Sequence, residues 1–134
     1  MKKNKPLQSY LNLEKALKSL EKAVATPPVE ERDYGGIIQA FESVYELTWK
    51  TLKKVLEVNG IDAPFPRVVF EEAFKRDMLE GNKIWLKISE DRNLSVHTYD
   101  QDMAIQLCKR IKDDYVVIFK QTVQKMKPFM NESK

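Results

Sequence analysis

The sequence predicts an all-α protein, an antiparallel up-and-down bundle of four to five helices. Apolar residues recur at steps of three and four along every long segment, which is the period of an amphipathic helix. The four glycines and six prolines mostly stand between these segments, where they separate one helix from the next. Strand signals are nearly missing, because the β-branched stretches RVVF and YVVIF both lie inside helical periods. Long helices joined by short breaks favour a bundle.

The first two helices are expected at residues 10–25 and 34–60. In the first, Leu13, Leu17 and Leu20 form one apolar stripe, and the prolines of TPPVEERD stop it. The second has a wider apolar face that can contact more than one neighbour, and it ends at the NG pair, which tolerates left-handed geometry.

The remaining helices follow the connector IDAPFPR. A shorter helix is expected at 67–80, where Phe70, Phe74 and Met78 are four residues apart and Gly81 lies past the end. A fourth is expected at 82–93, and a long last helix runs from about residue 99 until Pro128 ends it. We therefore treat 1–134 as a single helical bundle domain, with frayed ends expected at about 1–9 and 128–134.

Composition excludes several classes of protein. With one cysteine and one histidine, no internal disulfide and no Cys/His zinc site can form, so we expect no metal and no cofactor. Cys108 adjoins an apolar stripe and is expected to be a partly buried structural thiol. The net charge of +3 is compatible with a polyanionic partner but does not by itself indicate one. The start, MKKNKPLQSY, is not followed by an apolar signal region, and no apolar run reaches the length of about 18 that spans a membrane, so a cytoplasmic protein is expected.

The stretch DRNLSVHTYD, residues 91–100, holds the chain's one histidine, five positions after Arg92. In an unbroken helix these two side chains would point about 140° apart and could not share a ligand. A break would bring them together, and Thr98 with Gln101 matches a capping box that would start a new helix there. Arg92, Asn93, His97 and Tyr99 would then gather around one junction.

This set of side chains suits cleavage of an RNA phosphodiester without metal. The imidazole of His97 would accept the proton of the 2′-hydroxyl, and Arg92 would stabilise the charge developing on the phosphate. Asn93 would help to hold the phosphate. The alternative from the residues alone is structural: His97 bonds a helix-end carbonyl, Arg92 pairs with Asp91 or Glu90, and Tyr99 packs.

The segment resembles the R-x-x-x-x-H-x-Y motif of HEPN-domain proteins. Together with IIQAFESVYELTWKTLKKVLEVNG and RNLSVHTYDQDMA, it is similar to the HEPN partner of a minimal nucleotidyltransferase (MNT), a family also called nucleotidyltransferase substrate-binding protein or HepT. The resemblance runs from about residue 11 to 126.

The resemblance implies a helical bundle, usually a homodimer, that acts as a metal-independent RNA-cleaving toxin in a two-gene toxin–antitoxin system. Its antitoxin partner would be the minimal nucleotidyltransferase, which in some members transfers AMP to the motif tyrosine. By position, Arg92 and His97 would be catalytic, Asn93 auxiliary and Tyr99 the site of AMPylation. The alternative is a non-catalytic adaptor that binds the nucleotidyltransferase. The chain itself lacks a P-loop and paired acidic transferase residues, so it is not the transferase.

Two other groups of side chains have structural and functional interpretations. Aromatic residues on helical faces are expected in the core or a dimer contact, with base stacking as the alternative, and basic residues on helix surfaces are expected to be solvated, with a phosphate track as the alternative. The first group is Phe41, Tyr45, Trp49, Phe70 and Phe74, and the second is Lys50, Lys53, Lys54, Arg67, Lys75 and Arg76.

Overall fold

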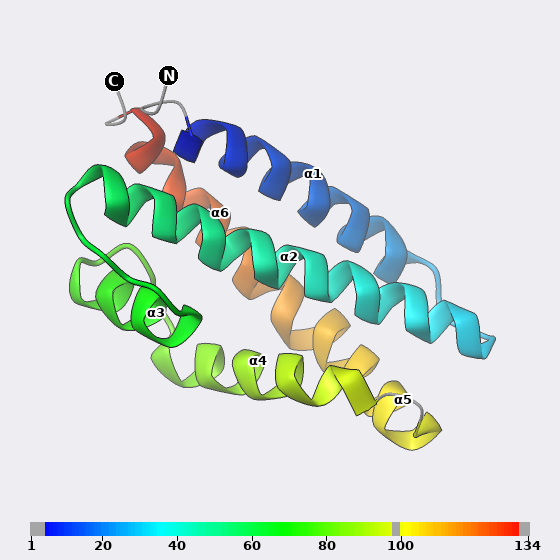
Figure 1. Cartoon of the computed structure of the whole chain (residues 1–134). Helices are drawn as coiled ribbons and strands as arrows, with labels where there is room; N and C mark the ends of the chain where they lie inside the picture. The colour runs from blue at the N-terminus through cyan, green and yellow to red at the C-terminus, as the bar shows by residue number, and fades with distance from the viewer. Residues whose placement is uncertain (1–4, 98–99, 132–134) are drawn as a thin grey trace.

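The computed structural model describes residues 5–97 and 100–131, and these form a bundle of helices without a strand. Helices α1 (Lys5–Ala25) and α2 (Glu31–Val58) lie antiparallel, as Figure 1 shows. The short α3 (Pro66–Lys75) packs on α2 and leads into α4 (Asn82–Leu94). A 3₁₀ turn (Ser95–His97) precedes α5 (Gln101–Arg110), which continues through a π-helical turn (Ile111–Tyr115) into α6 (Val116–Asn131). The predicted all-α bundle is confirmed.

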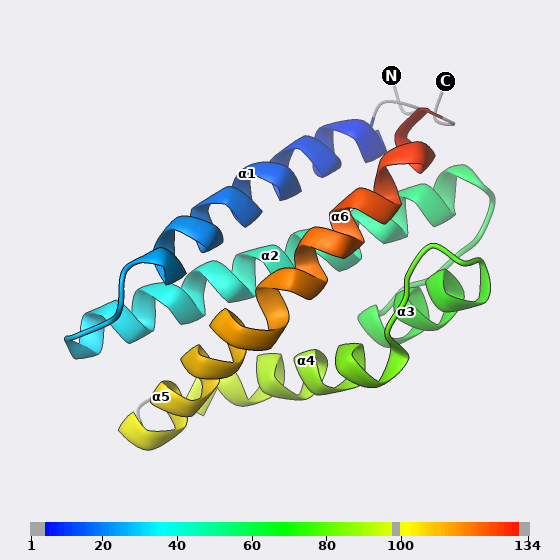
Figure 2. The ribbon, with the colours of Figure 1, turned by 180° about the vertical axis from the view of Figure 1, so that it is seen from behind.

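The long last helix returns along the bundle to the beginning of α1. Figure 2, the view from behind, shows α6 crossing in front of α2, and the hydroxyl of Tyr10 on α1 donates to the carbonyl of Val123 on α6 at 3.3 Å. This places the α4–α5 junction at the opposite end of the molecule from the start of α1 (Figure 1).

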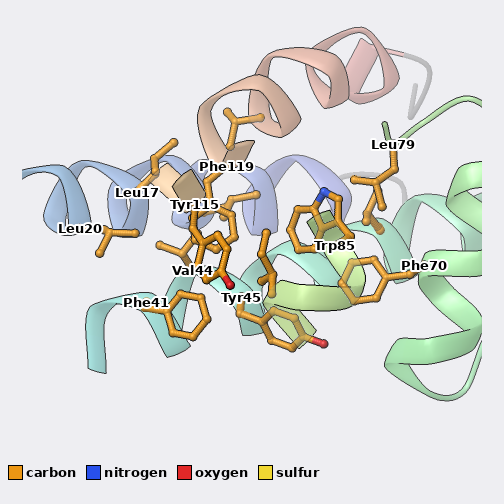
Figure 3. Close-up of a cluster of buried hydrophobic side chains, with 14 of the residues drawn as sticks. Leu17, Leu20, Phe41, Val44, Tyr45, Phe70, Leu79, Trp85, Tyr115 and Phe119 are labelled. Atoms are coloured by element: carbon orange, nitrogen blue, oxygen red, sulfur yellow. The ribbon is translucent and has the colours of Figure 1, made fainter. Parts of the chain in front are cut away.

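Aromatic side chains from four helices fill the core. Phe41, Trp85, Tyr115 and Phe119 are all at most 1% exposed, and they contact one another with ring centroids 5.7–6.0 Å apart, as in Phe41–Tyr115 and Trp85–Phe119 (Figure 3). Burying side chains of this size is the main favourable term for folding, and truncating one to alanine typically costs about 3–5 kcal/mol.

Glycine geometry ends α2 and begins α4. Gly60 has φ +77°, and the amide of Ile61 donates to the carbonyl of Leu56 at 2.9 Å, which completes a Schellman motif at the predicted NG stop. Gly81 has φ +82° at the N-cap of α4, and a Cβ there would lie 2.7 Å from Cγ2 of Ile84. Both positions therefore need glycine.

The third helix is shorter than the sequence predicts. It ends at Lys75, where Asp77 takes φ +58° and the amide of Met78 donates to the carbonyl of Ala73 at 2.9 Å. A Schellman turn places its final residue back against the helix, so Met78 is buried although it has left the helical path.

Some of the residues expected in frayed ends at 1–9 and 128–134 are helical in the described part of the chain. Helix α1 begins at Lys5 and buries Pro6 and Ser9, and α6 passes through Pro128 to Asn131. Pro128 removes one helical hydrogen bond, but Met126 and Met130, 1% and 7% exposed, hold the last turn by packing on the core. None of the described helices is both long and apolar enough to cross a lipid bilayer.

Candidate functional site at the junction of α4 and α5

Helix α4 ends between Arg92 and His97, which is the condition for the two side chains to approach each other. Helix α4 ends at Leu94, and the backbone of His97 belongs to the 3₁₀ turn that follows. The chain therefore leaves the single helical path that would have separated the two side chains by about 140°. The side chain of His97, and Tyr99 entirely, lie outside the described residues.

The predicted capping box does not start α5. Asp100 is the N-cap residue, and its carboxylate accepts hydrogen bonds from the amides of Asp102 and Met103 at 3.0 and 3.3 Å. A carboxylate caps better here because its charge also complements the positive end of the helix dipole. Thr98, the expected cap, lies outside the described residues.

Arg92 lies in the last turn of α4 and faces two carboxylates of α2. Its side chain is 25% exposed, with Nη1 3.8 Å from Oε2 of Glu42 and Nη2 3.7 Å from Oε1 of Glu46. Nη1 also donates to Oγ of Ser95 at 3.5 Å, a long hydrogen bond. The buried Nε has no hydrogen-bond partner among the residues that the structure describes. The guanidinium is thus compensated in charge but weakly hydrogen-bonded.

The carboxylates that face Arg92 have other partners. Ser95, 3% exposed, donates from its hydroxyl to Glu42, and the same hydroxyl lies 2.7 Å from the carbonyl of Arg92. Glu46 accepts a hydrogen bond from the indole of Trp49 at 3.1 Å and lies 3.8 Å from Nζ of Lys50. These contacts hold the carboxylates in place, and Arg92 does not pair with Asp91 or Glu90 as the structural interpretation supposed.

Asn93 is exposed and follows Arg92 on the same turn. Both residues line one groove between α2, α3 and α4. The structure therefore places Arg92 and Asn93 on one surface, with the backbone of His97 on the turn that follows.

A second cluster lies directly behind Arg92 and was not anticipated from the sequence. Asp91 is 1% exposed, and its two carboxylate oxygens accept hydrogen bonds from Nε and Nη2 of Arg110 at 2.8 and 2.9 Å. The hydroxyl of Tyr115, on the π-helical turn, also donates to Asp91. Burial, followed by the hydrogen bond to Asp91, raises the pKa of Tyr115, so the phenol stays protonated. Spacing offered a signal, because Asp91 follows Trp85 and Ile88 at steps of three on the buried face.

The other candidate side chains are structural. Cys108 is 4% exposed and burial raises the pKa of its thiol to about 11, which keeps it protonated and poorly nucleophilic at neutral pH. No group of three or more His, Cys, Asp or Glu side chains within 5–97 and 100–131 is arranged to hold a metal ion.

The aromatic and basic groups follow their structural interpretations. Phe41, Tyr45 and Phe70 are buried, and Trp49 and Phe74 pack against the core. Most of the basic side chains lie within 4 Å of glutamates on their own helix, in the pairs Lys50–Glu46, Lys53–Glu57, Arg67–Glu71, Lys75–Glu72 and Arg76–Glu72.

Comparison with known proteins identifies relatives. The chain is 31% identical over 94 residues to the "Probable ribonuclease HepT" of Haemophilus influenzae, and the match covers 66% of this chain but only 64% of that relative's length. A crystal structure of a protein from Thermus thermophilus superposes with a TM-score of 0.68 at 25% identity, covering 91% of this chain and 98% of that one. The family model described as "Nucleotidyltransferase substrate binding protein like" matches residues 8–128. The chain therefore belongs to the nucleotidyltransferase substrate-binding protein family that includes HepT.

Proposed function

We propose that this chain is the HEPN component of a two-gene HEPN/MNT toxin–antitoxin system and cleaves RNA without metal. The observation that carries the proposal is the environment of Arg92. Its partly buried guanidinium makes only long contacts with its neighbours, and its Nε has no hydrogen-bond partner among the described residues. The chain's one histidine follows five residues later. A phosphate oxygen within about 3 Å would satisfy this guanidinium better than the carboxylates at 3.7 and 3.8 Å do. The similarity to a probable ribonuclease supports the same activity.

The chemistry assigns a separate task to each residue of the motif. His97 accepts the proton of the 2′-hydroxyl, and the freed oxygen attacks the adjacent phosphorus. The bond to the 5′-oxygen of the next nucleotide breaks, which leaves a 2′,3′-cyclic phosphate. The departing 5′-oxygen takes up a proton from solvent and becomes a 5′-hydroxyl. Arg92 stabilises the charge on the phosphate, and Asn93 donates a hydrogen bond to it.

The test is cleavage of RNA by the purified chain in EDTA. His97→Ala and Arg92→Ala should each lower the rate of cleavage by about 100-fold or more. The double variant should be little worse than either, because groups that act as a unit are not additive. The matched control is Arg32→Ala, which removes an 85% exposed arginine in the first turn of α2 that does not line the groove at Arg92. Full activity in His97→Ala would contradict the catalytic assignment.

The second candidate is a non-catalytic adaptor that binds a nucleotidyltransferase, which the family description favours. RNA left intact by the wild-type chain, together with a stable complex with the cognate nucleotidyltransferase, would select this function.

We assign the partner enzyme the role of antitoxin through AMPylation of Tyr99. An AMP group near Arg92 would place a phosphate beside the guanidinium and block RNA. Incubation with the cognate nucleotidyltransferase, ATP and magnesium should add one AMP to a peptide containing Tyr99 and none in Tyr99→Phe. Silencing in a tight complex without an adduct would replace modification by simple occlusion.

We further propose a homodimer with two-fold symmetry. At the end of α4 and on the turn after it, Leu94 and Val96 are 46% and 65% exposed, and exposed apolar side chains that lie close together mark interfaces. Light scattering should give twice the 15.7 kDa chain mass at micromolar concentration. A monomer mass would count strongly against it.

A further inference from the structure

A groove of about 800 Å³ between α2, α3 and α4 leads away from Arg92 and Asn93. Its volume lies within the range of small-molecule sites, roughly 300–1,000 Å³. Tyr45, Phe70 and Trp85 from the three helices contribute to its lining, and Figure 3 shows their rings gathered together. Ring centroids lie 5.8 Å apart for Tyr45 and Phe70, and 5.1 Å apart for Phe70 and Trp85. The lining is therefore aromatic and held rigid by the core.

Two large apolar side chains of the same groove remain exposed to solvent. Phe65, at the start of α3, is 63% exposed, and Leu86, on α4, is 61% exposed. An exposed aromatic face beside a groove offers a stacking surface that the fold itself does not use.

The charges of the groove decide which part of a nucleotide fits. Its lining includes the carboxylates of Glu46, Glu71 and Glu90 against the guanidinium groups of Arg67 and Arg92. Arg67 lies 3.6 Å from Glu71, so its charge is already compensated. A phosphate inside the groove would meet repulsion, whereas a phosphate at the Arg92 end, with an uncharged base in the groove, would not.

We propose that this groove binds a nucleobase of the RNA substrate, next to the phosphate held by Arg92, and that the base stacks on Phe65. The proposal rests on the proposed function for the position of the phosphate. The carboxylates accept hydrogen bonds and cannot donate them, so bases with an exocyclic amino group, such as cytosine, bind better than uracil. Glu90 is the carboxylate assigned to this contact, because it is exposed and has no ion-pair partner among the described side chains.

The experiment measures binding separately from cleavage. In the His97→Ala, Trp49→Phe background, Trp85 is the only tryptophan left, and it lines the groove. Titration with tetracytidine should change its fluorescence, and tetrauridine should bind more weakly. Phe65→Ala should weaken tetracytidine binding by about 5- to 100-fold, the effect of losing one stacked base. Glu90→Gln should remove the preference for cytidine.

The matched control is Val29→Ala, which shortens an 83% exposed apolar side chain between α1 and α2 and should leave binding unchanged. Equal affinity in Phe65→Ala and the parent overturns the proposal. So does sedimentation in which Phe65→Ala and Leu86→Ser dissociate a dimer, because a second copy would then occupy the groove. RNA that binds the groove but is not cleaved by the wild-type chain would refute the proposed function and leave this binding site standing.

Discussion

Asp91 and Arg92 are neighbours in one turn of α4, yet their surroundings are opposite. Asp91 is 1% exposed and accepts close hydrogen bonds from Arg110 and Tyr115. Arg92 is 25% exposed, faces carboxylates at 3.7 and 3.8 Å, and keeps a buried Nε without a partner in the described part of the chain. A buried charge must be paired to be tolerated, so the first cluster is explained by the fold. The guanidinium of Arg92 is compensated in charge but weakly hydrogen-bonded, which is the geometry expected of the phosphate site that we propose.

The two arginines make the same point with one residue type. Arg110 engages both oxygens of one carboxylate through its fork, and this hydrogen bonding raises the pKa of its guanidinium further. Arg92 is split between two carboxylates and engages neither closely. Hydrogen-bond geometry, and not residue type or sequence position, thus separates the structural Arg110 from Arg92, the arginine that we propose binds phosphate.

The largest effect is expected from Arg92→Ala, and it falls on activity. Loss of a group that stabilises developing charge should lower the rate of RNA cleavage by about 10²–10³-fold. Stability should change by no more than about 1 kcal/mol, because Glu42 and Glu46 are 30% and 37% exposed and can be hydrated. Urea denaturation beside the cleavage assay measures both, and a large loss of stability would show that Arg92 is structural after all.

Arg110→Met should produce the reverse pattern. It leaves Asp91 buried with only Tyr115 as a partner, which should cost about 3 kcal/mol of unfolding free energy. The double variant Asp91→Asn, Arg110→Met should recover part of this loss, since no unpaired charge remains. Urea denaturation of all three proteins tests it, and equal stability of Arg110→Met and wild type would remove the distinction between the clusters.

Tyr115→Phe should cost less, about 1–2 kcal/mol, because Asp91 keeps both hydrogen bonds from Arg110. The ring is otherwise retained in the core, so packing against Phe41 is unchanged. Thermal unfolding followed by circular dichroism measures the change, and a loss as large as that of Arg110→Met would place the main anchor of the cluster at Tyr115.

Ser95→Ala should have the smallest effect, about 1 kcal/mol or less, from the loss of one hydrogen bond to Glu42. The partly exposed Glu42 can turn to water in exchange. Chemical denaturation measures this change. RNA cleavage that falls as far as in Arg92→Ala would mean that Ser95 positions the arginine.

Periodicity predicted most of the fold because each long helix carries its own apolar stripe. It extended the third helix too far, since Met78 continues the step of four although the chain has turned back at Asp77. A buried residue need not be helical. A Schellman turn places its last side chain back on the apolar surface of the helix, so Met78 continues the apolar pattern after the helix has ended.

Local sequence signals could predict the parts of the candidate site that are close in sequence, but not its contacts with distant helices. A helix break after Arg92 was expected from the sequence and α4 does end at Leu94, but the residue that caps α5 is Asp100 and not Thr98. Glu42 and Glu46, more than 40 residues earlier, come to Arg92 through the packing of α2 against the rest of the bundle, and no local pattern marks them as its partners. Asp91 was considered a partner of Arg92, but its direction on the helix carries it to Arg110 instead.

The π-helical turn at Ile111–Tyr115 determines how far the side chains of α5 are rotated about the helix axis relative to those of α6. A π turn takes up one residue more than an α turn, and each residue advances an α-helix by about 100°. Straightening the turn by deleting one residue would keep α6 in register with the core and swing α5 around its own axis. Arg110 would then point away from Asp91, and the chain that enters α5 from His97 would start on a different side of the bundle. This single turn thus lets α6 face the core while α5, on the same continuous helix, keeps the orientation that the junction with α4 requires.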